Sequence, residues 1–194
     1  MAGRHVALIR GINVGRAKRV AMADLRGLLA DLGYREVETL LNSGNIVFSA
    51  GHEKPSRIGQ RIEVAMRERL GVSAPVTVLT AGAFSTVVEE NRLGEVAKDP
   101  ARFLVAFCND AGRLKQLERL ARQPWSPEAL AVGSVAAYLW CASGILESRL
   151  AEAVGRVLGE STTTRNWTTV TKIHALLQNS LTTADSALRR PRKG

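Results

Sequence analysis

The chain has few of the residues on which disulfide and metal chemistry depend. Its 194 residues include two cysteines and three histidines, and only 5% are aromatic. Cys108 and Cys141 both fall in apolar, strand-like runs, so we expect buried free thiols and not a disulfide or a metal pair. His5, His52 and His174 show no metal-ligand spacing. We therefore expect neither a metal site nor a cofactor.

Long apolar runs and the common nucleotide-binding or catalytic motifs are also missing. No apolar segment reaches the ~18 residues of a membrane span, and the N-terminal region lacks the pattern of a signal peptide. We therefore expect a cytoplasmic protein that does not interact with membranes. The sequence contains no Walker A loop, no Gly-x-Ser-x-Gly elbow and no Gly-x-Gly-x-x-Gly fingerprint, which argues against three large enzyme classes.

Positive charge, in contrast, is in excess. The formal net charge is +9, and four of these charges lie in a basic C-terminal tail, residues 181–194, that we expect to be disordered. Near the N-terminus, five cations precede Asp24, the first acidic residue: Arg4, Arg10, Arg16, Lys18 and Arg19. This bias favours an anionic partner, either a small molecule or a nucleic acid.

Hydrophobic periodicity predicts a β-α-β-β-α-β order in the first half of the chain. The predicted elements are a strand at 4–12, a helix at 22–32, strands at 36–41 and 45–49, a helix at 56–70 and a strand at 75–79. Gly33 and Gly71 stand where each helix should end. This element order is typical of ferredoxin-like folds.

The second half repeats the same order after an extra helical segment at 81–92 and a polar linker at 94–101. The predicted elements are a strand at 102–108, a helix at 111–121, strands at 129–132 and 135–141, a helix at 146–158, a short strand at 162–164 and a helical segment at 167–177. We therefore predict an α+β fold of two ferredoxin-like halves with antiparallel sheets, residues 1–93 and 102–180. A single larger α/β sheet is the alternative.

The segment Arg10-Gly-Ile-Asn-Val-Gly15 follows the first predicted strand and has two interpretations. In one, Gly11 and Gly15 permit the turn and Asn13 caps it. In the other, Arg10 and the loop amides bind a phosphate or carboxylate.

A second motif, Leu41-Asn-Ser-Gly-Asn-Ile-Val-Phe48, is either a plain hairpin turn or a set of hydrogen-bond donors beside the first motif. In a ferredoxin-like order the first and third strands are antiparallel neighbours. The turn that contains Ser43 and Asn45 should then lie near Arg10 and Gly11.

The third motif is Thr164-Arg-Asn-Trp-Thr-Thr-Val170, at the start of a late helix. Asn166 is a good N-cap candidate, and Trp167 is suited to packing between the halves. Arg165 and the helix N-terminus either have a structural role or face the cleft of the first motif. We predict that Arg10, Asn45 and Arg165 converge on one solvent-accessible cleft.

Together, the three motifs resemble a bacterial family of proteins of unknown function, DUF1697. Its members carry an R-G-I-N-V-G-G segment, an S-G-N-V-V-F-like hairpin and a T-R-N-W segment, in the order found here. The resemblance spans nearly the whole chain before the basic tail. This chain has Arg16 where the family commonly has a second glycine, which adds a cation. The resemblance implies a two-part α+β fold and no activity.

Three functions fit the sequence. The first is a binding module for a nucleotide, nucleic acid or phosphorylated metabolite in a cleft between the halves. The alternatives are a small-molecule enzyme that uses Arg10, Asn13, Asn45 and Arg165, and a partner-binding protein whose glycine loops are structural. Carboxylates are sparse near the motifs, so no acid–base pair is evident and the catalytic residues are unknown. The candidate ligand-binding residues are Arg10, Gly11, Asn13, Gly15, Ser43, Asn45, Arg165 and Asn166.

Overall fold

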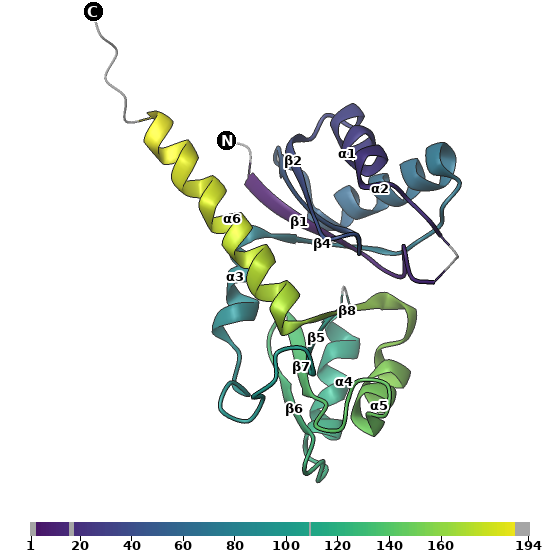
Figure 1. The fold of residues 1–194 in the computed structure, drawn as a ribbon, viewed down its shortest axis with the longest axis vertical. Helices are drawn as coiled ribbons and strands as arrows, with labels where there is room; N and C mark the ends of the chain where they lie inside the picture. The colour runs from purple at the N-terminus through teal and green to yellow at the C-terminus, as the bar shows by residue number, and fades with distance from the viewer. Residues whose placement is uncertain (1–2, 16–17, 109, 189–194) are drawn as a thin grey trace, which may run out of the picture.

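The computed structural model describes residues 3–15, 18–108 and 110–188. It contains two sheets, each with two helices on its outer face and two further helices, α3 and α6, at the junction (Figure 1). The first half comprises β1 (Gly3–Ile9), α1 (Met22–Asp31), β2 (Arg35–Leu40), β3 (Asn45–Ala50), α2 (Pro55–Leu70) and β4 (Val76–Thr80). After α3 (Ala81–Glu89), the second half comprises β5 (Phe103–Cys108), α4 (Ala111–Ala121), β6 (Ala129–Val132), β7 (Ala136–Trp140), α5 (Arg149–Leu158), η1 (Gly159–Ser161) and β8 (Thr162–Asn166), followed by α6 (Trp167–Leu188).

The two sheets have equivalent topologies. Their strand orders are β2-β3-β1-β4 and β6-β7-β5-β8, and all neighbouring strands are antiparallel. Each half is therefore a βαββαβ unit with its first strand between its third and fourth. The predicted fold of two ferredoxin-like α+β halves is confirmed, and the alternative of one larger sheet is excluded.

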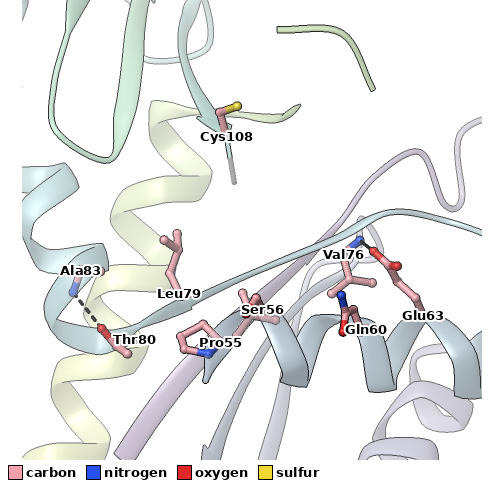
Figure 2. Close-up of a pocket in the computed structure, with 10 residues that line it drawn as sticks. Pro55, Ser56, Gln60, Glu63, Val76, Leu79, Thr80, Ala83 and Cys108 are labelled. Carbon is pink, nitrogen blue, oxygen red and sulfur yellow. Dashed lines mark hydrogen bonds between the residues drawn. The ribbon is translucent and has the colours of Figure 1, made fainter. Parts of the chain in front are cut away.

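Side-chain caps define where several helices begin. The Thr80 hydroxyl accepts a hydrogen bond from Ala83 N at the start of α3 (3.1 Å; Figure 2). The Ser148 hydroxyl accepts one from Ala151 N at the start of α5 (2.9 Å). The predicted start of α5 at residue 146 is therefore wrong: the Ser148 hydroxyl caps the N–H of Ala151, Glu128 accepts from Leu150 N, and Leu146 precedes the helix in solvent.

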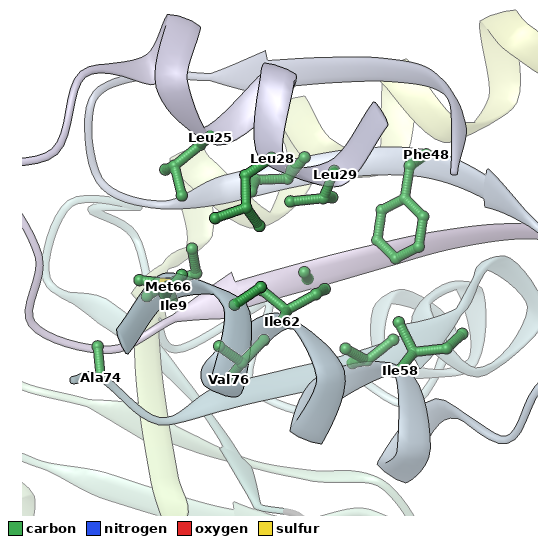
Figure 3. Packing of buried hydrophobic residues seen from close by; sticks show 14 of the residues in the cluster. Ile9, Leu25, Leu28, Leu29, Phe48, Ile58, Ile62, Met66, Ala74 and Val76 are labelled. Carbon is green, nitrogen blue, oxygen red and sulfur yellow. The ribbon is translucent and has the colours of Figure 1, made fainter. Parts of the chain in front are cut away.

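The apolar spacing of α1 and α2 accounts for the core of the first half. Leu25, Leu28 and Leu29 of α1 recur three or four positions apart and meet Ile58, Ile62 and Met66 of α2 above the sheet (Figure 3). Phe48 of β3 points into the same layer. A corresponding layer joins α4 and α5 to the second sheet.

A third apolar cluster joins the two halves. It is contributed by the inner faces of both sheets and by α3 and α6, and it includes Val6, Leu8, Val47, Phe84, Phe103, Phe107, Tyr138, Val170 and Ile173. Trp167 packs against this cluster, with its ring 5.1 Å from that of Phe103, as the packing interpretation of Trp167 predicts. The Tyr138 hydroxyl also donates to Val87 O across the junction (2.7 Å). The halves therefore share a continuous core.

Helix α6 is longer than the sequence predicts. It extends to Leu188, whereas the apolar pattern ends near residue 177 and the tail was placed at 181–194. Residues 181–188 of the predicted tail are helical, and 189–194 lie outside the described residues, so their disorder stays a prediction. Among the helices that the structure describes, none combines the length and apolarity needed to cross a bilayer.

His5 gives a pH-dependent contribution to stability that can be tested. It is buried and stacks on Phe48, and burial lowers the pKa of its imidazole below 6.5. The unfolded chain therefore binds more protons below pH 6.5, and stability falls as the pH decreases through that range. His5→Phe keeps an aromatic ring at this position. Between about pH 7 and about pH 5, we expect this variant to lose less unfolding free energy than the natural protein does. Chemical denaturation of both proteins checks this, and equal losses would contradict it.

Candidate functional site

A cavity of about 540 Å³ lies where the two halves meet. Its walls come from the end of β1 and the loop after it, the β2–β3 turn, β5, the loop before α5, α5, β8 and the start of α6. Arg10 and Arg165 are both among the lining residues, and no aspartate or glutamate is. The cavity is therefore a region of positive charge between two segments about 150 residues apart.

The register of the first sheet brings two of the sequence motifs to this cavity. Leu8 of β1 pairs with Asn45 of β3, and Ile9 N donates to Gly44 O (2.8 Å). The chain then leaves β1 through Arg10 and Gly11, whose φ of 67° is readily accessible to glycine. The predicted proximity of the β2–β3 turn to the end of the first strand is confirmed.

Arg165 connects the second half to both motifs of the first. Its Nε donates to Asn45 Oδ1 (2.5 Å), and its Nη2 donates to Ile9 O (2.8 Å) and Ser43 O (3.1 Å). One guanidinium of β8 thus holds the end of β1, the hairpin turn and the first residue of β3.

The two remaining N–H groups of Arg165 are also used within the protein. Nη1 donates to Thr163 Oγ1 (2.9 Å) and Thr164 O (2.8 Å), so all five donors of the guanidinium have acceptors. Every acceptor is neutral, and no carboxylate pairs with Arg165 among the described residues. Burial lowers the pKa of Arg165 to about 10, so it stays charged at neutral pH. Arg165 supplies positive potential without a spare donor.

Arg10, in contrast to Arg165, is partly exposed and has hydrogen-bond donors that are not used within the described residues. Its side chain is partly exposed, and Nη1 donates to Gly159 O (3.2 Å) and lies 3.5 Å from Glu160 Oε2. The Glu160 side chain is 91% exposed, so this ion pair is weak. Arg10 Nε and Nη2 have no acceptor within the part of the chain that the structure describes, and neither do the amides of Gly11 and Ile12. Arg10 therefore has donors available for a ligand.

Asn13 and Gly15 shape the loop that carries the lining residues Ile12 and Val14. The Asn13 amide donates to Val20 O and Asn42 O (2.9 Å each), and its oxygen accepts from Val20 N (2.8 Å). Neither Asn13 nor Gly15 lines the cavity. Both have positive φ, 57° and 62°, as the turn interpretation of this segment requires. Arg16, which replaces the second family glycine, lies outside the described residues.

Both side-chain groups of Asn45 are bonded within the protein, and so is the Oδ1 atom of Asn166, which lines the cavity. Asn45 is fully buried, and its Nδ2 donates to Leu40 O and Ser43 Oγ (3.0 Å each). Asn166 Oδ1 accepts from Thr169 N (3.0 Å) and the Thr169 hydroxyl, which makes it the predicted N-cap of α6. Arg10 and Arg165 thus share one cavity, while Asn45 lies beneath it in contact with Arg165. Ligand binding by the eight candidate residues stays a prediction.

Sequence reasoning missed the threonines and the apolar residues of the cavity. Thr162, Thr163 and Thr164 line it, and only Thr164 is exposed. The Thr-Thr-Thr run directly before Arg165 was the available signal. Val14 and Ile145 also line the cavity. Val14 belongs to the first motif but was not a candidate site residue, and Ile145 lies in a loop outside the three motifs.

A second cavity, of about 560 Å³, lies between α2, β4 and the start of α3 (Figure 2). Its one charged lining residue is Glu63, whose Oε1 accepts from Val76 N (2.7 Å). It therefore does not suit an anion. Cys108 lines it and is partly exposed, which corrects the prediction that both thiols are buried; Cys141 is buried, and neither forms a disulfide within the described residues.

The fold defines a two-part α+β protein with a cationic cavity at the junction. A family model described as "Protein of unknown function (DUF1697)" matches residues 2–138, and the chain belongs to this family. The match contains the first two motifs and ends before Thr164, so it covers less of the chain than the motif resemblance does.

The chain is also similar to a solved structure, that of a conserved bacterial protein from Streptococcus pneumoniae. The two share 24% sequence identity with a TM-score of 0.74, over 91% of this chain and 99% of the other. This similarity supports the fold alone. No curated protein matches the chain.

Proposed function

We propose that the protein is a binding module for an anionic ligand, which it holds in the cavity at the junction of its halves. The observation that carries the proposal is the charge of the lining: among the described residues, two guanidinium groups and no carboxylate line the cavity, and Glu160, which pairs with Arg10, is 91% exposed. A buried cation without a carboxylate is costly unless other groups compensate it. A bound phosphate or carboxylate would compensate the charge of the buried Arg165 and would accept hydrogen bonds from the partly exposed Arg10.

The two arginines would have different roles. Arg10 has free donors and can form a charge-assisted hydrogen bond with an anionic oxygen. The unpaired amides of Gly11 and Ile12 lie in the same loop and are suited to further oxygens. Arg165 contributes its charge while its hydrogen bonds keep the wall of the cavity in place.

The dimensions favour a nucleotide or a phosphorylated metabolite over a nucleic acid. A volume of about 540 Å³ is within the range of small-molecule sites. Ferredoxin-like domains that bind RNA stack bases on exposed aromatic residues of the sheet. Here Phe48 is fully buried beneath α1 and α2.

The lining residues also bear on the alternative of an enzyme. No aspartate, glutamate, histidine or cysteine lines the cavity. General acid–base and nucleophilic catalysis commonly rely on these side chains. Binding is therefore the function that the geometry supports best.

The test is the effect of Arg10→Gln on the binding of inorganic phosphate and of AMP, measured by isothermal titration calorimetry. We expect Arg10→Gln to bind both anions at least about tenfold more weakly than the natural protein, because a hydrogen bond to a charged group is lost. Arg156→Gln is the control, since Arg156 is an exposed cation of α5 paired with Glu152. Unchanged affinity in Arg10→Gln, or no anion binding by the natural protein, would refute the proposal.

A further inference from the structure

Two large hydrophobic side chains that line the same cavity are exposed to solvent. The structure describes six that are well exposed: Val14, Leu41, Val64, Val96, Ile145 and Leu146. Val14 (70% exposed) and Ile145 (38%) line the cavity, and Leu146 (97%) follows Ile145 in the chain. Single exposed hydrophobic residues are common, but two that line one cavity need an explanation.

The two loops that carry Val14 and Ile145 are each hydrogen-bonded to a neighbouring segment. Asn13 Nδ2 donates to Asn42 O (2.9 Å), which fixes the loop of Val14 against the turn that begins at Leu41. Asn13 also bonds both backbone groups of Val20. Ile145 O accepts from Ser148 N, so its loop is tied to the start of α5. The apolar rim is therefore part of a defined structure.

The cavity combines this rim with the positive charge of Arg10 and Arg165. A small, fully hydrophilic anion such as inorganic phosphate would pair with Arg10 but leave Val14 and Ile145 in water. A ligand that also carries an apolar group would bury them, and this burial is favourable in proportion to the area covered.

The geometry points to an amphiphilic small anion as the ligand. Its phosphate or carboxylate group would bind at Arg10, and its aliphatic or aromatic body would lie over Val14 and Ile145. This inference rests on the proposed function, because both concern the same cavity. A negative head group is complementary to the two cations, and an apolar body is complementary to the rim.

The experiment compares phenyl phosphate and 3-phenylpropionate with inorganic phosphate by titration calorimetry. We expect phenyl phosphate to bind about tenfold more tightly than inorganic phosphate, through burial of apolar area equivalent to roughly two methylene groups. In Ile145→Ser, the ratio of the two affinities should fall toward one. Val14→Ser should have the same effect and provides a second, highly exposed position.

Val96→Ser is the matched control, because Val96 is 49% exposed but lies outside the cavity. It should leave the ratio unchanged. Tight binding of both phenyl phosphate and 3-phenylpropionate would show that the site accepts either head group, and binding of phenyl phosphate alone would assign a phosphate.

Two outcomes would overturn the inference, and they are distinguishable. If phenyl phosphate and inorganic phosphate bind equally, and Ile145→Ser and Val14→Ser change nothing, the amphiphilic ligand is wrong while Arg10-dependent anion binding stands. If none of the three probes binds, or binding is insensitive to Arg10→Gln, the proposed function fails as well.

Discussion

Replacing Arg165 with methionine is expected to lower the free energy of unfolding by about 2–4 kcal/mol. Arg165 donates to Asn45 Oδ1, Ile9 O and Ser43 O, which all belong to the other half of the protein. Methionine keeps much of the side-chain volume but leaves these acceptors without a donor, and Asn45 is fully buried. A buried acceptor that loses its partner costs about 1–3 kcal/mol. Equilibrium unfolding in urea measures the change.

Two further variants test the mechanism of this loss. Arg156→Met removes an exposed arginine of α5 that pairs with Glu152, and a change within about 0.5 kcal/mol is expected. Asn45→Ala and the double variant complete a cycle with Arg165→Met, whose coupling free energy should be about 1.5–3 kcal/mol. A coupling near zero, or equal losses in the two arginine variants, would show that Arg165 does not connect the halves through Asn45.

Gly44→Ala is expected to destabilise the protein by about 2–5 kcal/mol. Gly44 has a φ of 73°, and a Cβ atom there would lie 2.9 Å from Ile12 Cδ1 and from Ile9 Cβ. Alanine would therefore add backbone strain to a steric overlap in a close-packed region. Thermal and chemical denaturation measure the combined effect.

Gly71→Ala separates the two contributions. Gly71 ends α2 with a similar φ of 64°, but nothing lies within 4 Å of a Cβ atom at that position. Only the backbone strain applies, so a loss of about 1–2 kcal/mol is expected. If both alanine variants lose the same amount, the contact of Gly44 with the isoleucines is not the reason why glycine occupies the turn.

Much of the fold was predictable because its signals are local. Apolar spacing identified α1, α2 and α4, and the Asn-Ser-Gly-Asn turn identified the β2–β3 hairpin. The start of α5 and the end of α6 were less predictable. The Ser148 cap competed with an apolar pattern that continued upstream to Leu146, and α6 continues to Leu188, beyond the helical pattern predicted at 167–177.

The site was predictable in location but not in the roles of its residues. Residue types alone made Arg10 and Arg165 equivalent candidates for binding an anion. In the structure, Arg165 has five acceptors and Arg10 retains free donors. A count of hydrogen-bond partners requires coordinates, and a sequence motif contains no such information.

Local patterns in the chain were enough to specify the order of the elements, the neighbouring positions of β1 and β3, and the three motifs. Hydrophobic periodicity and turn-forming residues are patterns that span only a few residues, so they can be recognised from the sequence without a structure. The cavity, the five hydrogen bonds of Arg165 and the apolar rim depend on tertiary structure. They join residues such as Ile9 and Arg165, which are 156 positions apart and meet only because a shared apolar core packs the two sheets together.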